Sequence, residues 1–208
     1  MLIPLGKLIL SVAGATALFI CVVALIASLF TGINFFHVIR ALKDILFLAF
    51  STASSEAALP GAMKRLEELG VPKTIVTFVM PTGYSFNLDG STLYSSAGIL
   101  FIAQLYGIQM PIEQQLLVMV TLMLSTKGIA GVPGAGIIVV AATAAAFNLP
   151  TEGVAILLGI DRLLDMIRTI CNVCGNCMAT VVVACWEKEL NKATFNEKYR
   201  AFLGGKNR

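Results

Sequence analysis

The feature that most constrains this chain is a line of charged and amide residues within an otherwise apolar stretch, residues 154–186. On a helix that advances about 100° per residue, the line covers an arc of about 80°, and its members are Asp161, Asp165, Arg168, Asn172 and Asn176. The sequence therefore predicts a membrane helix that is apolar except for one buried polar stripe. Ionisable side chains at that depth cost at least about 2 to 3 kcal/mol each unless they are paired or hydrated, and they commonly mark a substrate or ion pathway. A purely structural Asp–Arg brace is the alternative.

The composition agrees with a membrane protein. Of the 208 residues, 57% are hydrophobic and only 13% are charged, and the mean hydropathy is +0.86, which exceeds what is typical of soluble domains. The net charge of +3 is small and dispersed, and no basic patch alternates with aromatic residues, so no nucleic-acid partner is predicted. We expect a lipid bilayer to surround the fold.

The uncharged run at residues 8–30 predicts a full transmembrane helix. About 20 residues at about 1.5 Å each are enough to cross a hydrocarbon core about 30 Å thick. A signal peptide would have a shorter apolar core followed by soluble sequence, whereas more membrane sequence follows residue 30. We therefore expect this first span to stay in the mature protein.

Residues 37–69 combine two short apolar arms, 39–50 and 63–69, with a small polar tip at 51–56. Neither arm can cross a bilayer, and backbone that is freed at membrane depth must face protein or water. The pattern therefore predicts a re-entrant helical hairpin. A pair of water-exposed helices fits the charged second arm equally well.

Residues 72–106 could form one long span, but they are interrupted at 81–83 by Pro-Thr-Gly and at 87–91 by Asn-Leu-Asp-Gly-Ser. Such a break frees backbone carbonyls and adds a carboxylate and an amide oxygen, which are the ligands that small cations prefer. We predict a broken helix that binds ions. The alternative is a polar loop between two shorter spans.

A second hairpin is predicted at residues 111–147, with arms at 112–124 and 137–147 around a glycine-rich tip at 125–136. Glycine tolerates positive φ and lets the backbone approach a ligand closely, so this tip can offer carbonyls to a cation or amides to a carboxylate. It is not a phosphate loop, because no Gly-Lys-Ser/Thr sequence ends it and no strand precedes it.

The order of these segments is the one expected of inverted repeats with a binding site between them. The predicted segments are a span at 8–30, hairpins at 37–69 and 111–147, a broken span at 72–106 and a polar-striped span at 151–187. Basic residues outnumber acidic ones in the remaining tail, 188–208. The positive-inside bias therefore predicts a cytoplasmic C-terminus.

The cysteines Cys171, Cys174, Cys177 and Cys185 are spaced like part of an iron–sulfur binding run. On a helix their sulfur atoms point away from the polar stripe and spread over a broad arc, so one helix cannot gather three of them around a metal. We interpret them as packing residues and predict no disulfide. A membrane redox or metal protein is the alternative that they leave open.

Four motifs together resemble a known family. They are STASSE at 51–56, PTGYSFNLDGST at 81–92, STKGIAGVPGAG at 125–136 and GIDRLLDMIRTICNVCGN at 159–176. In this order and spacing they are similar to the dicarboxylate/amino acid:cation symporter family, especially its bacterial glutamate/aspartate symporters. The likeness runs from the first span to the end of the last.

The resemblance implies an all-α membrane protein, the transport domain of an elevator-type symporter with two re-entrant helical hairpins and broken or polar-striped transmembrane helices. Residues 1–187 would form part of that domain, multi-pass in the bacterial cytoplasmic membrane. The family's N-terminal half, which supplies the trimer scaffold and one further transport-domain span, is expected to lie outside this sequence. Either the sequence is a fragment or the partner half is encoded separately, and homotrimer partners are implied. The implied activity is symport of glutamate or aspartate with protons and/or sodium, with no enzymatic activity and no cofactor.

Matched residue by residue, the resemblance assigns Asp165 to the substrate's amino group and Arg168 to its side-chain carboxylate, which a guanidinium can bind in a fork. The other implied substrate contacts are Ser54, Ser55, Ser91, Ala135, Gly136, Thr169 and Asn172. The implied cation ligands are Gly83, Ser85, Asn87, Asp89, Asn172 and Asn176, with the carbonyls of Thr126, Lys127 and Ile129.

The sequence departs from the sodium-coupled members of that family at two positions. Asn176 stands where they carry an aspartate, and Ala53 stands where some carry an arginine. Glu56 adds a carboxylate to the first tip, where loss of water would favour its protonation. Glu56 is therefore a candidate proton carrier, with a helix-capping role as the alternative. These departures favour proton coupling, or mixed proton and sodium coupling.

A proton-coupled C4-dicarboxylate carrier is the second reading of the resemblance. Asp165 discriminates between the two substrates, because a dicarboxylate has no amino group for that carboxylate to bind.

Overall fold

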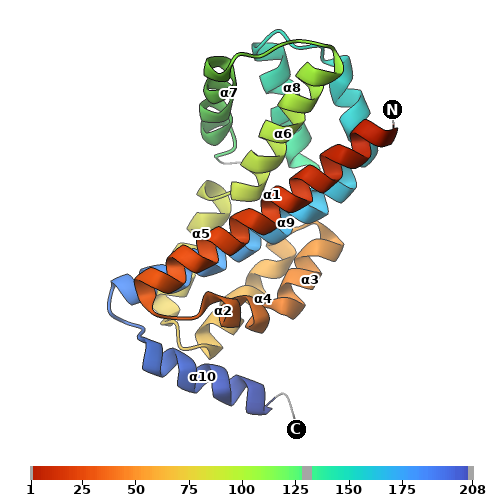
Figure 1. Cartoon of the computed structure of the whole chain (residues 1–208). Helices are drawn as coiled ribbons and strands as arrows, with labels where there is room; N and C mark the ends of the chain where they lie inside the picture. The colour runs from red at the N-terminus through yellow and green to blue at the C-terminus, as the bar shows by residue number, and fades with distance from the viewer. Residues whose placement is uncertain (1, 128–132, 206–208) are drawn as a thin grey trace.

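Two long helices form the axis of the molecule (Figure 1). The computed structural model describes residues 2–127 and 133–205, and the regular elements of this part are all helices. Helix α1 (Leu2–Thr31) packs along α9 (Glu152–Trp186), and both are long and apolar enough to cross a membrane. Both predicted spans are helices in the structure: α1 begins earlier than the predicted span 8–30, and α9 nearly coincides with the predicted span 151–187.

The shorter helices gather in two groups at opposite ends of α9 (Figure 1). The first group contains α2 (Phe35–Ala41), α3 (Lys43–Thr52), α4 (Ser55–Glu68) and α5 (Lys73–Phe86). The second contains α6 (Asp89–Leu105), α7 (Ile112–Ser125) and α8 (Ala135–Ala146). Each group has its own hydrophobic core, one built on α9 from Val173 onward and one on α9 up to Leu164. The middle of α9, where the polar stripe lies, falls between the two cores.

The first hairpin is a helix–turn–helix in which Ala53 and Ser54 connect α3 to α4. Ala53 adopts a left-handed conformation with φ 51°, and the Ser54 hydroxyl accepts a hydrogen bond from the Ala57 amide at 3.2 Å, which caps α4. The prediction of a second arm that begins at residue 63 is wrong, because this N-cap starts the helix at Ser55 and α4 continues through Pro60.

The predicted broken span is confirmed at one of its two interruptions. Only Asn87 and Leu88 separate α5 from α6. The expected break at residues 81–83 is wrong, because α5 continues through Pro81 to Phe86. Membrane helices tolerate an internal proline more readily than soluble ones, and in the same turn the Thr82 hydroxyl donates to the Phe78 carbonyl at 2.7 Å.

The second hairpin has the predicted arms, α7 and α8, and Gly134 enters α8 with φ 80°. Residues 128–132 of its tip, which include the predicted tip residues Gly128, Ile129 and Gly131, lie outside the described residues. The C-terminal segment is more ordered than the predicted basic tail. It contains α10 (Lys192–Gly205), whose Phe195 and Tyr199 are buried in the core formed by α2 to α5.

Candidate functional site

The five stripe residues of α9 are all buried, as the helical periodicity predicts. Arg168 and Asp165 form an ion pair, with Nη2 and Nε of the arginine 2.7 and 2.8 Å from Oδ1 of the aspartate. The structural alternative of an Asp–Arg brace is therefore present in this conformation. Without the other, either residue would be a buried charge that lacks a partner. The ion pair can therefore open only if another group of opposite charge replaces each partner.

The second hairpin covers this pair. The Gly134 amide donates to Asp165 Oδ2 at 2.7 Å, and Gly136 lies so close to the Arg168 guanidinium that a Cβ atom there would overlap Nη1. Arg168 Nη1 is buried and has no hydrogen-bond partner among the described residues, while Tyr94 places its ring 5.0 Å from Arg168 Cζ. An unsatisfied guanidinium nitrogen beside the tip is what a site for a carboxylate requires.

Tyr94 also makes a contact that the sequence did not predict. Its hydroxyl donates to Asp161 Oδ1 at 2.5 Å, and both residues are buried. Asp161 therefore has a partner on α6 rather than on its own helix. The only signal in the sequence was a tyrosine within an apolar helical segment, and that pattern does not identify a partner.

The break between α5 and α6 is fixed to α9 by Asn172. Its Oδ1 accepts from the Gly90 amide at 2.8 Å, and its Nδ2 donates to Ser91 Oγ at 3.1 Å. Gly90 must be glycine here, because a Cβ atom would collide with the Arg168 carbonyl and lie 2.7 Å from Cys171 Cβ. Asn172 and Ser91, two predicted ligands, are thus together, and in this conformation they bond to each other.

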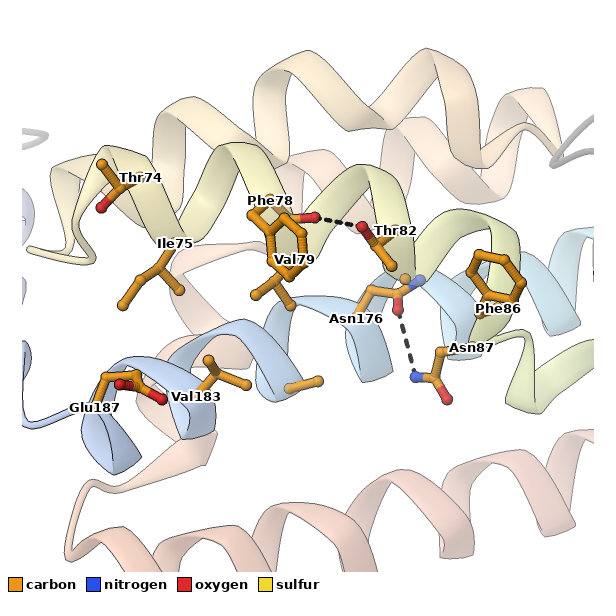
Figure 2. Close-up of a pocket in the computed structure, with 12 residues that line it drawn as sticks. Thr74, Ile75, Phe78, Val79, Thr82, Phe86, Asn87, Asn176, Val183 and Glu187 are labelled. Carbon is orange, nitrogen blue, oxygen red and sulfur yellow. Dashed lines mark hydrogen bonds between the residues drawn. The ribbon is translucent and has the colours of Figure 1, made fainter.

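Most of the predicted cation ligands surround the same break. Asn87 Nδ2 donates to Asn176 Oδ1 at 3.3 Å, as Figure 2 shows. Gly83 packs directly against the Asn176 amide, and the Asp89 carboxylate faces Gly175 on α9. Amide and carboxylate oxygens therefore converge where the helix is interrupted.

Two residues at the start of the second hairpin's tip contact the two sides of the break. Thr126 Oγ1 and Thr92 Oγ1 are 3.0 Å apart, which joins the tip to α6. Lys127 Nζ donates to the Phe86 carbonyl at 2.5 Å, which joins the tip to α5. The first hairpin also contacts α9, because Arg162 Nη2 donates to the Thr52 carbonyl at 3.2 Å.

Some predicted residues stand apart from this cluster. The Ser85 and Glu56 side chains are exposed, with Glu56 in the first turn of α4. The Ser54 hydroxyl is the N-cap of α4 and the Thr169 hydroxyl donates to the Asp165 carbonyl at 2.8 Å, so both already have partners. Ser55 is buried beside the first tip, and Ala135 is half-buried at the start of α8.

A groove of about 590 Å³ runs between α5 and α9 beside the break (Figure 2). Its lining residues are Thr74, Ile75, Phe78, Val79, Thr82, Gly83, Phe86, Asn87, Asn176, Ala179, Val183 and Glu187. The groove is mostly apolar; the two asparagines that bond to each other form its end at the break, and Thr74 and Glu187 lie toward the other end (Figure 2).

Two cysteines of α9, Cys174 and Cys177, lie away from the polar cluster, whereas Cys171 packs against Gly90 at the start of α6. Cys174 and Cys177 belong to the core formed by α2 to α5, and Cys171 is also buried. All the cysteines have free thiols. This placement agrees with the interpretation of Cys174 and Cys177 as packing residues.

Comparison with known proteins decides the family. Residues 1–186 match the sodium:dicarboxylate symporter family. The chain belongs to this family. The predicted resemblance is confirmed, and the chain is accordingly a membrane protein of a transporter family.

The curated relatives that the chain matches are about twice as long as the chain. It is 54% identical over 192 residues to the proton/sodium-glutamate symport protein of Geobacillus stearothermophilus, which covers 92% of this chain and 45% of the relative. It is 48% identical over 201 residues to the proton/glutamate-aspartate symporter of Escherichia coli (strain K12), covering 97% and 46%. It is 43% identical over 205 residues to the C4-dicarboxylate transport protein of Burkholderia pseudomallei (strain 668), covering 98% and 47%. The chain thus spans about half the length of each relative.

Proposed function

We propose that this chain forms the substrate-binding part of a secondary symporter that carries glutamate or aspartate across the bacterial cytoplasmic membrane, coupled to protons and/or sodium. The observation that carries the proposal is the buried Asp165–Arg168 pair beneath the second hairpin, with Arg168 Nη1 lacking a partner among the described residues. One carboxylate and one guanidinium side by side match an amino group and a carboxylate on one substrate. Relatives named as glutamate and glutamate-aspartate symporters support the same substrate class.

Binding would exchange one ion pair for two. The substrate's ammonium group would replace Arg168 at the Asp165 carboxylate, and its side-chain carboxylate would replace Asp165 at the guanidinium. Both protein charges then keep a partner of opposite sign, and only the substrate's main-chain carboxylate must be met by uncharged groups. A substrate that carries only one of these groups would leave the other protein charge unpaired, at a cost of about 3 to 5 kcal/mol.

The other substrate contacts would come from the two hairpin tips. Ser54 and Ser55 would bind the main-chain carboxylate, with Ser91, Thr169 and Asn172 nearby. The hydroxyls that are bonded locally in this conformation would have to keep those bonds or exchange them for bonds to the substrate. Ala135 and Gly136 would close over the bound molecule.

The coupling cations would bind around the break between α5 and α6. Gly83, Ser85, Asn87 and Asp89 would supply ligands from the break itself, with Asn176 opposite and the carbonyls of the second tip alongside. Asn176 is neutral, which weakens the attraction for sodium and favours a share of proton coupling. Glu56 is our candidate for the proton carrier, and its place in the first turn of α4 fits a capping role equally well.

The complete transporter would contain a second half and further copies. We propose that the missing half supplies the scaffold of a homotrimer, and that residues 1–187 move against it as an elevator, with both hairpins re-entrant and residues 188–208 in the cytoplasm. The groove between α5 and α9 is where a further transport-domain span would complete the cation region.

A C4-dicarboxylate carrier is the second candidate, supported by the relative of that name at 43% identity. Such a substrate would satisfy Arg168 and leave Asp165 without a partner. We therefore favour the amino acid.

The test is acidic-substrate uptake by the assembled transporter carrying Arg168→Cys. We expect loss of glutamate and aspartate uptake, with retained or new uptake of small neutral amino acids, because the variant removes only the charge that pairs with the side-chain carboxylate. Competition assays in proteoliposomes give the measurement. Undiminished glutamate and aspartate uptake in the variant would remove Arg168 from the site.

A further inference from the structure

The side chain of Lys127 has no role in the function proposed above. This residue follows the C-terminal end of α7, at the described edge of the second hairpin's tip. The expectation from the resemblance concerned only its carbonyl, but its ammonium group donates to the Phe86 carbonyl at 2.5 Å. Phe86 is the last residue of α5, where the final carbonyls of a helix lack helical partners and carry partial negative charge.

The charges near this contact balance one another. Asp89 opens α6 on the other side of the break, and the Lys127 charge acts on it. On α9, Asn176 is neutral, and Asp165 and Arg168 compensate each other through their ion pair. Residues 128–132 of the tip add no charge, because their sequence contains no ionisable side chain.

The ammonium group also makes a connection that a bound cation would otherwise make. A cation between the carbonyls of the tip and those of the broken helix would draw the two segments together. Lys127 joins the tip to α5 through the Phe86 carbonyl, and the Thr126–Thr92 contact joins it to α6. The tip is therefore fastened to both sides of the break by groups of the chain itself.

We propose that Lys127 is a tethered cation, whose ammonium group replaces a free sodium ion between the tip of the second hairpin and the break of the α5–α6 span. This inference rests on the proposed symport function, and it identifies Lys127 as the residue that lowers the transporter's requirement for sodium. Removing the ammonium group leaves the Asp89 charge and the Phe86 carbonyl without a cation, so a sodium ion then binds in its place.

The experiment compares Lys127→Gln, Lys127→Arg and Lys73→Gln in the assembled transporter, purified in detergent. Lys73→Gln removes the same charge from an exposed position at the opposite end of α5, so it controls for net charge. Glutamate affinity is measured in sodium chloride and in choline chloride at equal ionic strength. We expect sodium to increase the affinity of Lys127→Gln about tenfold more than that of the native protein, which corresponds to about 1.4 kcal/mol. Lys73→Gln and Lys127→Arg should respond like the native protein.

A second measurement separates this inference from the proposed function. Without substrate, replacing choline chloride by sodium chloride should raise the melting temperature of Lys127→Gln only. This expectation holds whatever substrate the transporter carries. The same sodium response in Lys127→Gln and Lys73→Gln would overturn the proposal. Loss of substrate binding in Lys127→Gln at every sodium concentration would also overturn it, because a free cation must be able to replace a tethered one. If the glutamine variant does not fold, a gain of sodium response in Lys127→Arg contradicts the proposal.

Discussion

Asp165→Asn separates amino acids from dicarboxylates. In the structure the Asp165 carboxylate accepts two hydrogen bonds, from Arg168 Nε and from the Gly134 amide, and its Oδ1 also lies 2.7 Å from Arg168 Nη2 in the ion pair. The variant keeps the shape of the side chain and removes its charge. Arg168 loses its partner in the empty site of the variant, and this change in free energy is the same whichever substrate then binds. The ratio of two substrate affinities therefore isolates the contact with the substrate's ammonium group.

The size of the effect follows from that contact. A hydrogen bond between charged groups contributes about 1.5 to 3 kcal/mol. Taking about 2 kcal/mol, the affinity for glutamate relative to succinate should fall roughly 30-fold. The absolute affinity for succinate should not fall, because succinate has no group that needs the carboxylate and would leave it without a partner in the native protein.

The assay is inhibition of labelled glutamate or succinate uptake in proteoliposomes that contain the assembled transporter. Asp161→Asn is the matched control, since Asp161 is also a buried carboxylate on α9 but bonds to Tyr94. We expect this control to leave the ratio of the two affinities unchanged. If Asp165→Asn weakens glutamate and succinate equally, Asp165 is a structural brace and the proposed role in binding the amino group is wrong.

Three further variants test coupling and stability. Glu56→Gln should flatten the pH dependence of net uptake and leave substrate exchange largely intact, measured with an imposed proton gradient; an unchanged pH profile would leave Glu56 only its place in the first turn of α4. Asn176→Asp should increase the sodium dependence of uptake, because it adds a carboxylate beside Asn87; a sodium titration equal to that of the native protein would contradict this. Tyr94→Phe should lower the free energy of unfolding by about 1.5 to 3 kcal/mol, because buried Asp161 loses its partner. Thermal unfolding in detergent measures this loss, and Tyr106→Phe at an exposed tyrosine should change it by less than about 0.5 kcal/mol.

The sequence predicted those parts of the molecule that depend on periodicity and length. The stripe from Asp161 to Asn176 could be identified because a helix places residues three and four apart on one face. The break at Asn87 was predictable because polar residues and glycine interrupted an apolar run. The same reasoning gave a wrong result at Pro81, since membrane helices tolerate an internal proline and α5 continues through it to Phe86.

The parts that the sequence did not predict depend on contacts between distant segments. Asp161 and Asp165 are equivalent in the helical pattern, yet one accepts from Tyr94 on α6 and the other from the Gly134 amide of the second hairpin. The choice is made by which residues of α6 and of the second hairpin face them. In the same way, Phe195 and Tyr199 turned a basic tail into a packed helix, because their partners lie on elements far away in the chain.

The polar cluster at the middle of α9 can be understood from the helix ends that meet there. The ends of α3 and α5 present carbonyls and receive cationic groups, Arg162 at Thr52 and Lys127 at Phe86. The beginnings of α6 and α8 present amides and receive oxygen acceptors from α9, Asn172 at Gly90 and Asp165 at Gly134.

Each of these contacts has the sign that the partial charge of the helix end favours. Short helices that end inside the molecule would otherwise leave unsatisfied backbone groups at a depth where water is scarce. The residues that make these contacts therefore stabilise the fold in the conformation described. A substrate or cation that enters the cluster must offer an equal exchange for the bonds it displaces, so we expect a ligand carrying both charges to fit this site better than one carrying a single sign.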